Sequence, residues 1–144
     1  TIVRPSAVYG PTDMNRRVSQ IFIEKALNKQ KIKVHGEDEK LDFTYIKDIA
    51  HGAILASVRE EGKNEDFNIT HGKAHTLLDY VNCLKAYFPD LDYEILPRDA
   101  FRPKRGTLSI EKAEKLIGYS PKYSLKEGVD EYVKFVQKHK EKLL

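Results

Sequence analysis

The 144-residue chain has no tryptophan, one methionine and one cysteine. Because Cys83 stands alone, an intrachain disulfide and a thiolate metal cluster are both excluded, and a reducing, cytoplasmic location is expected. No apolar run approaches the ~20 residues that span a membrane, and no segment has the pattern of a signal peptide. Low-complexity tracts are also absent, and 40% of the residues are hydrophobic, so we expect a packed domain and not a disordered chain.

Several motifs of catalysis and nucleotide binding are missing as well. The eight glycines never form a G-x-G-x-x-G or P-loop spacing, so no nucleotide fingerprint is encoded. No tyrosine is followed four residues later by a lysine, and no G-x-S-x-G or H-E-x-x-H occurs. His71 and His75 are interrupted by Gly72 at an expected turn, which favours a solvated loop over a zinc site. We therefore expect no catalytic residue and no metal ligand in this sequence.

The overall charge is only mildly positive. The 25 basic and 22 acidic side chains leave a net charge of +3, which by itself does not indicate a nucleic-acid partner. A chain of this length can bury roughly two thirds of its unfolded surface. One domain, or one half of a two-lobed domain, is therefore expected.

The apolar pattern predicts short strands that alternate with helices. Alternating or β-branched stretches predict strands, and apolar residues three and four apart predict amphipathic helices. Strands are expected at residues 2–3, 31–35, 41–46, 67–69 and 93–96. Helices are expected near 15–29, 48–59, 76–88 and 109–116, and from 124 toward the C-terminus. This alternation predicts an α/β fold.

Four of the expected helices begin next to side chains that can cap them. An oxygen-bearing side chain at a helix start accepts a hydrogen bond from a free N–H of the first turn. A serine or threonine followed three positions later by an acid can form a reciprocal capping box. The expected caps are Asp48, Ser109 and the two boxes Thr76 with Asp79 and Ser124 with Glu127, and Gly118 is expected to end the fourth helix.

The densest polar cluster lies at residues 98–106, here called the basic loop. It holds four cations within eight positions, Arg98, Arg102, Lys104 and Arg105, and Pro103 stiffens it. Arginine binds phosphate oxygens with paired donors, so the loop suits a phosphate or a diphosphate. A solvated basic loop and a nucleic-acid patch are the alternatives, although no RNP-type motif accompanies the loop.

A second polar constellation surrounds an apolar, aromatic stretch at residues 41–50. Asp42 stands at its start and Asp48 near its end. We expect structural roles for both, with Asp42 satisfying nearby backbone groups or an arginine and Asp48 capping the helix. The lysines near the C-terminus are expected to form a solvated helix face.

Short motifs follow one another in order along nearly the whole chain. They are R-P-S-A-V-Y-G-P (4–11), V-H-G (34–36), D-F-T-Y-I-K-D-I-A (42–50), F-N-I (67–69), R-P (102–103), K-A (112–113), L-I-G-Y-S-P (116–121) and E-G (127–128). Together they resemble the C-terminal part of an extended short-chain dehydrogenase/reductase. More narrowly, they resemble the nucleotide-sugar epimerase/dehydratase family.

The resemblance implies C-terminal strands of a Rossmann-like parallel sheet plus a small mixed α/β substrate-binding lobe. Residues 1–14 and about 46–70 would lie on the Rossmann side, and about 15–45 and 71–144 mainly in the substrate lobe. Enzymes of this family bind NAD on an N-terminal Rossmann sheet, where a Y-x-x-x-K motif assists transient hydride transfer between the sugar and NAD. Since both features are missing here, we expect a fragment that is inactive alone. Its parent would be a cytoplasmic, homodimeric enzyme that binds NAD mainly through its N-terminal part.

The resemblance also implies residues for cofactor and base binding. Pro5 and Ser6 match the loop that the family places beside the nicotinamide and the sugar. Val34 and His35 fall where the family lays backbone and a flat side chain against the nucleotide base. Phe43 falls on a strand that lines the same pocket.

The expected diphosphate site combines one match with two departures from the family. Arg102 matches the arginine that binds the diphosphate of the nucleoside-diphosphate sugar. Ala7 stands where the family often has an asparagine that touches the substrate phosphates, and Leu41 stands where it often has a second arginine. Arg105, with Lys104, is expected to replace the missing cation.

Two other classes of function stay open at this point. One is a non-catalytic, reductase-like regulator that senses NAD(P). The other is an interaction or nucleic-acid-binding module that uses the basic loop and the C-terminal lysines. Within the enzyme reading, epimerisation, dehydration and decarboxylation share this lobe.

Overall fold

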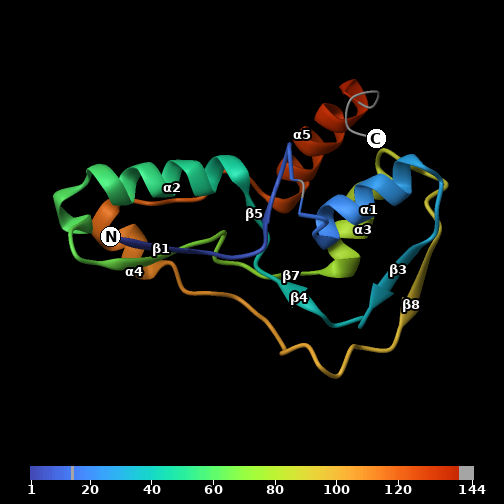
Figure 1. The fold of residues 1–144 in the computed structure, drawn as a ribbon, viewed down its shortest axis with the longest axis horizontal. Coiled ribbons are helices and arrows are strands. Elements are labelled where there is room, and N and C mark those ends of the chain that lie inside the picture. Colours follow the sequence, from blue (N-terminus) through green and yellow to red (C-terminus); the bar gives the residue numbers. More distant parts are fainter. Residues whose placement is uncertain (14, 140–144) are drawn as a thin grey trace.

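A computed structural model describes residues 1–13 and 15–139 of the chain. Helices and short strands alternate along it, which confirms the predicted α/β fold (Figure 1). In chain order the elements are β1 (Ile2–Pro5), β2 (Val8–Tyr9), α1 (Val18–Leu27), β3 (Ile32–His35), β4 (Lys40–Leu41), β5 (Thr44–Tyr45), α2 (Ile46–Val58), a 3-10 turn (Glu60–Gly62), β6 (Asp66–Ile69), β7 (His75–Thr76), α3 (Leu77–Lys85), β8 (Tyr93–Leu96), α4 (Glu111–Ile117) and α5 (Leu125–Lys138).

The strands join segments that are far apart in the sequence. β1 runs parallel to β6, β2 parallel to β5, and β3 parallel to β8, while β4 and β7 are antiparallel. Parallel neighbours cannot be joined by a tight hairpin and need a long crossover, usually helical. The parallel pairing follows from this alternation of strands and helices.

The predicted extended stretch at residues 41–46 is divided in two. β4 pairs with β7, whereas β5 pairs with β2, and the turn between them carries Asp42 and Phe43. α2 begins directly after β5, at Ile46. This division points neighbouring side chains of one short segment toward different parts of the molecule.

One of the predicted capping residues was placed wrongly. Asp48 is the third residue of α2, and its buried carboxylate accepts hydrogen bonds from the backbone N–H groups of Lys122 (2.9 Å) and Tyr123 (3.1 Å). The side chain thus fastens α2 to the segment before α5 instead of capping its own helix. Ser109 lies one position before Ile110, the N-cap residue of α4, and its hydroxyl accepts a hydrogen bond of 3.4 Å from the N–H of Glu111, the first residue of that helix.

The other helix-end predictions are confirmed. Thr76 with Asp79 and Ser124 with Glu127 form complete capping boxes at α3 and α5. Gly118 ends α4 in the left-handed conformation, with φ +68°.

The buried side chains form two clusters. The large cluster joins α1, α3 and α5 to β3 and to the β2–β5 pair, and its members are Tyr9, Phe22, Ile23, Ile32, Val34, Phe43, Tyr45, Tyr80, Val81, Leu84, Leu125, Val129, Tyr132, Val133 and Val136. The small cluster joins α2 and α4 to β6, and its members are Ala56, Phe67, Ile69, Ala113, Ile117 and Tyr119. Figure 1 shows β1, α2 and α4 on one side of the molecule and α1, α3, β3 and β8 on the other.

Candidate functional site

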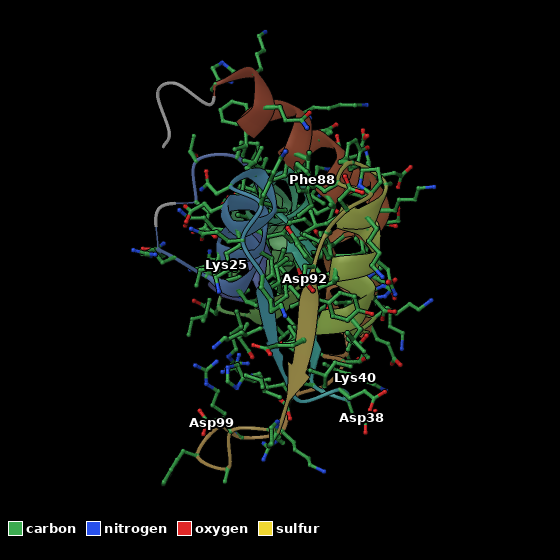
Figure 2. All side chains as sticks on the ribbon, turned by 90° about the vertical axis from the view of Figure 1, so that its right-hand side faces the viewer. Lys25, Asp38, Lys40, Phe88, Asp92 and Asp99 are labelled. Carbon is green, nitrogen blue, oxygen red and sulfur yellow. The ribbon has the colours of Figure 1, made fainter. Side chains whose placement is uncertain are left out.

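The basic loop connects these two sides of the molecule. It follows β8 and leads to α4, and in Figure 1 it runs along the lower edge in orange. Residues 100–109 are all exposed. Figure 2 shows Asp99 at the end of the molecule, with Asp38 and Lys40 at the same end. The four cations therefore sit on an exposed bridge between the clusters.

The four cations of the basic loop have different partners. Arg98 forms an ion pair with Glu39 and donates a hydrogen bond to the carbonyl of Arg102. Arg102 lies 3.2 Å from Asp99, and its side chain is 75% exposed. Within the described residues no ion pair is recorded for Lys104 or Arg105. Arg105 therefore combines an exposed guanidinium with free donors, while Arg98 is already engaged.

A first pocket of about 140 Å³ opens beneath the basic loop. Part of its lining is apolar and comes from α1, β4, α3 and the loop's own proline. The rest is polar and largely basic. The apolar residues are Val18, Phe22, Leu41, Leu77 and Pro103, and the polar residues are Lys33, His35, Glu39, Arg98, Asp99, Arg102 and Arg105.

A second pocket of about 330 Å³ lies beside the first. The two pockets adjoin because three residues, Val18, Leu41 and Arg105, line both of them. The second pocket is also lined by Pro5, Ala7, Val8, Arg17, Ser19 and Phe43. We call the pair the depression; Arg105 lines both of its parts.

The depression gathers five of the seven binding residues expected from the sequence. His35 and Arg102 line the first pocket, Pro5 and Phe43 line the second, and Arg105 lines both. These residues come from four segments of the chain, namely β1, β3, the β4–β5 turn and the basic loop, which supplies two of them. Their grouping required the folded structure.

The other two expected binding residues do not line either pocket. The side chain of Val34 is completely buried in the large cluster, so this position can present only backbone to a ligand. Ser6 is half-buried and adjoins Pro5 in the chain. Neither position is brought to the depression through its side chain.

Arg17 is a lining residue that the sequence reasoning missed. It stands immediately before α1, lines the second pocket together with Arg105, and donates a hydrogen bond of 3.0 Å to the carbonyl of Val8. The first N–H groups of a helix are unpaired and favour negative charge. The predicted helix began at residue 15, so Arg17 fell inside it, whereas in the structure α1 begins at Val18 and Arg17 is its N-cap residue. Neither the reach nor the direction of its side chain can be deduced from spacing.

The tyrosines near the depression stay protonated at neutral pH. Burial raises the pKa of Tyr9 and Tyr80 well above the usual value of a phenol. The pKa of Tyr45 is raised by burial and by its hydrogen bond of 2.8 Å to the carboxylate of Glu131. Burial disfavours the charged phenolate in each case.

Two classes of site are not found in the described residues. No group of three or more His, Cys, Asp or Glu side chains could hold a metal ion there. None of the helices in that part of the chain is both long enough and apolar enough to cross a bilayer.

Comparison with known proteins places the fold in a class. An epimerase of Methanothermobacter thermautotrophicus superposes with a TM-score of 0.90 at 27% identity, over 96% of this chain and 43% of that one. A UDP-glucuronic acid 4-epimerase from Bacillus cereus, in complex with UDP-glucuronic acid and NAD, gives a TM-score of 0.87 at 26% identity, over 96% and 45%. The fold is that of a short-chain dehydrogenase/reductase with its Rossmann-like parallel strands.

The sequence comparison agrees with the structural one. Residues 1–70 match the NAD dependent epimerase/dehydratase family. A putative UDP-glucose 4-epimerase of Methanocaldococcus jannaschii is 32% identical over 143 residues, which are 94% of this chain and 45% of that protein. UDP-glucuronic acid decarboxylase 1 of Danio rerio is 26% identical over 127 residues, 87% of this chain and 30% of that protein. The chain thus spans less than half the length of these relatives.

Proposed function

We propose that the chain is the substrate-binding part of an NAD-dependent nucleotide-sugar epimerase, dehydratase or decarboxylase. The observation that carries this proposal is the pair of adjoining pockets with Arg105 shared between them. A nucleoside-diphosphate sugar has an apolar-faced base at one end, two phosphates in the middle and a polar sugar at the other end. The depression offers apolar, cationic and polar lining residues for these three parts.

The first pocket is proposed to hold the base. Apolar side chains such as those of Phe22 and Leu77 line it, together with His35. Flat heteroaromatic rings gain from contact with apolar surface on one side and with another ring on the other. The ribose would then point along the depression toward Arg105.

The middle of the depression is proposed to hold the diphosphate. Arg105 lines both pockets, Arg102 lines the first, and Arg17 lines the second from the start of α1. Guanidinium groups bind phosphate through paired, charge-assisted hydrogen bonds. Since Leu41 lines both pockets without offering a donor, Arg105 would supply the cation that this position lacks.

The second pocket is proposed to hold the sugar and to lie next to NAD. Pro5, Ala7 and Phe43 line it. The chain has no glycine-rich phosphate cradle, so its residues fit only an outer contact with the nicotinamide end, through Pro5 and Ser6. When bound, NAD supplies a transient hydride acceptor. Because the sequence has no Y-x-x-x-K, we propose that the chain alone binds without catalysing, and that a homodimeric parent enzyme supplies the remaining groups.

The names of the relatives support a uridine nucleotide as the first probe. Solved neighbours are complexes with UDP-glucuronic acid and NAD or with UDP-glucose. The test is calorimetric titration of the purified chain with UDP and then with UDP-glucose. Removing one charge-assisted hydrogen-bonding group costs roughly 1.5–3 kcal/mol. Arg105→Ala and Arg102→Ala should therefore each weaken binding by about tenfold or more, whereas Arg59→Ala, at the exposed end of α2, should leave it unchanged.

Three results would contradict this proposal or favour another function. If a well-folded chain binds no uridine nucleotide, the proposed preformed site is wrong. If duplex or single-stranded DNA binds instead, with an affinity that falls steeply with salt, the basic loop serves a nucleic-acid partner. Binding of NAD(P) without any effect of UDP would favour the sensing function.

A further inference from the structure

Asp42 is a buried carboxylate outside the proposed pockets. It follows β4, and only 1% of its surface is exposed. No ion pair is recorded for it in the described part of the chain, and its oxygens are satisfied by three neutral donors. They are the hydroxyl of Thr70 (3.0 Å) and the backbone N–H groups of Gly72 (3.1 Å) and Leu108 (3.1 Å).

These donors come from two distant segments. Thr70 and Gly72 follow β6, on the side of the small cluster. Leu108 lies directly after the basic loop, 66 positions from Asp42 in the chain. A buried carboxylate without such donors would cost several kcal/mol, so the folded protein is strongly biased toward the arrangement that brings all three together.

The segment of residues 39–42 also binds the beginning of the basic loop. Glu39, three positions before Asp42, pairs with Arg98, and Arg98 in turn donates to the carbonyl of Arg102. The loop is therefore attached to residues 39–42 at both ends. Leu41, which stands between the two acids, lines both pockets.

The middle of the loop has few attachments of its own. Between Arg102 and Gly106 all residues are exposed, and a Cβ on Gly106 would meet no atom within 4 Å. Thr107 accepts a hydrogen bond from the N–H of Ala74 (2.9 Å) at an exposed position. The position of Arg105 therefore depends chiefly on where the two ends of the loop are fastened.

We propose that Asp42 is a positioning residue for the bound nucleotide, which holds Arg105 over the depression by accepting the N–H of Leu108. Glu39 performs the matching task at the other end of the loop through Arg98. The role in ligand binding rests on the proposed function, whereas the fastening of the loop does not. Arg98 is accordingly assigned to the structure of the loop and not to the diphosphate.

The first test needs no ligand and no variant. Native-state amide exchange should show Leu108 protected to a degree similar to Gly72, and far more than residues 101–106. The cause is that both N–H groups donate to one buried carboxylate. Exchange of Leu108 as fast as that of its exposed neighbours would overturn the proposal.

The second test compares Asp42→Ala with Thr70→Val. Both remove hydrogen bonds from the same buried group, but Thr70→Val leaves the bond to Leu108 in place. Trypsin cleavage after Lys104 and Arg105 should become at least about fivefold faster in Asp42→Ala only, and UDP affinity should fall about tenfold, as expected for the loss of one or two net hydrogen bonds. Equal effects in the two variants would contradict a positioning role and indicate general loosening.

A third variant covers the case in which Asp42→Ala does not fold. The single carbonyl oxygen of Asp42→Asn cannot serve Gly72 and Leu108 at once, because the two bonds go to different oxygens of the carboxylate. Amide exchange identifies which N–H has lost its acceptor. If the N–H of Leu108 exchanges faster, UDP affinity must fall. If the N–H of Gly72 exchanges faster instead, UDP affinity must stay unchanged. The reverse result would contradict the proposal. Absence of UDP binding by the unaltered chain would count against the proposed function, while the exchange and cleavage results would still decide the fastening.

Discussion

The large and the small cluster differ in how completely they are covered. The large cluster is enclosed by three helices and the β2–β5 pair, and its tyrosines and valines are almost wholly buried. The small cluster leaves apolar side chains on its outer faces, since Ile54 and Val58 of α2 are 60% and 69% exposed, and Ile2 of β1 is 60% exposed. One half of the molecule has a closed core, and the other has an open one.

This difference locates the expected weakness of the fold. Burial of apolar surface contributes roughly 25 cal/mol for each Å² removed from water, so the open cluster gains less from its own folding. The candidate site is built from both halves, because Phe43 belongs to the large cluster, while Asp42 is tied to the strand end of the small one. Loss of the small cluster would therefore disturb the basic loop before the large core unfolds.

The largest expected effect comes from cavities in the two cores. Leu84→Ala in α3 and Ile117→Ala in α4 each remove a fully buried side chain. Such substitutions cost about 3 kcal/mol. Urea unfolding should show Leu84→Ala lowering the stability of the whole chain. In Ile117→Ala, amide exchange should show β6 opening while α3 stays protected; simultaneous opening would mean that the clusters form one cooperative unit.

The next effect tests the connection between the clusters. Asp48→Ala removes the acceptor of the N–H groups of Lys122 and Tyr123. Leaving buried donors unsatisfied costs about 1–3 kcal/mol, so the midpoint of urea unfolding should fall. The unfolding midpoint of Asp48→Asn, which keeps one acceptor oxygen, should fall by less. Wild-type stability in Asp48→Ala would show that α2 is held by packing alone.

Two helical glycines provide a smaller and closely matched comparison. A Cβ at Gly128 would lie 2.1 Å from the hydroxyl of Tyr9, in the large cluster, and a Cβ at Gly52 would lie 2.3 Å from Ile69, in the small one. Overpacking of this kind costs about 1–3 kcal/mol, partly offset by the better helix propensity of alanine. Thermal unfolding should show Gly128→Ala as the more damaging change, because the open cluster can yield. The control Gly106→Ala has open space and should be neutral.

The smallest effect is electrostatic and belongs to the open side. Lys112 and Arg4 hold the pKa of the Asp66 carboxyl below its usual range. A depressed carboxyl pKa gives stability that is present above the unfolded-state value and is lost as pH falls through the folded-state value. Asp66→Asn should thus lower the melting temperature slightly at pH 7 and have no effect near pH 2. An equal decrease at both pH values would indicate a packing defect. Both partners are exposed, so the effect is expected to be small.

The sequence predicted what local interactions decide. The capping boxes at Thr76 and Ser124 involve residues three positions apart, and both helices begin where predicted. Asp48 was misjudged because the donors to its carboxylate, Lys122 and Tyr123, lie more than 70 positions away. Spacing along the chain carries no record of such a partner.

The candidate site shows the same division. The basic loop and His35 could be singled out from residue types and motif order, and the structure places both at one depression. Arg17 was missed because its place in the same pocket as Arg105 depends on how α1 packs. Asp42 was predicted only to satisfy nearby backbone groups or an arginine. Its actual donors, Thr70, Gly72 and Leu108, depend on the tertiary fold.

The parallel pairing of β3 with β8 has a consequence for the order of folding. Ile32 pairs with Tyr93 and Val34 pairs with Ile95, so β3 cannot pair until a long stretch of chain has closed into a loop. Contacts between residues distant in sequence are slow to form, because the entropy of loop closure has to be overcome first. The basic loop begins where β8 ends. A chain emerging from the ribosome would therefore form α1, α2 and α3 before the basic loop takes its place at the proposed binding site. Ligand binding is then expected to report the last steps of folding.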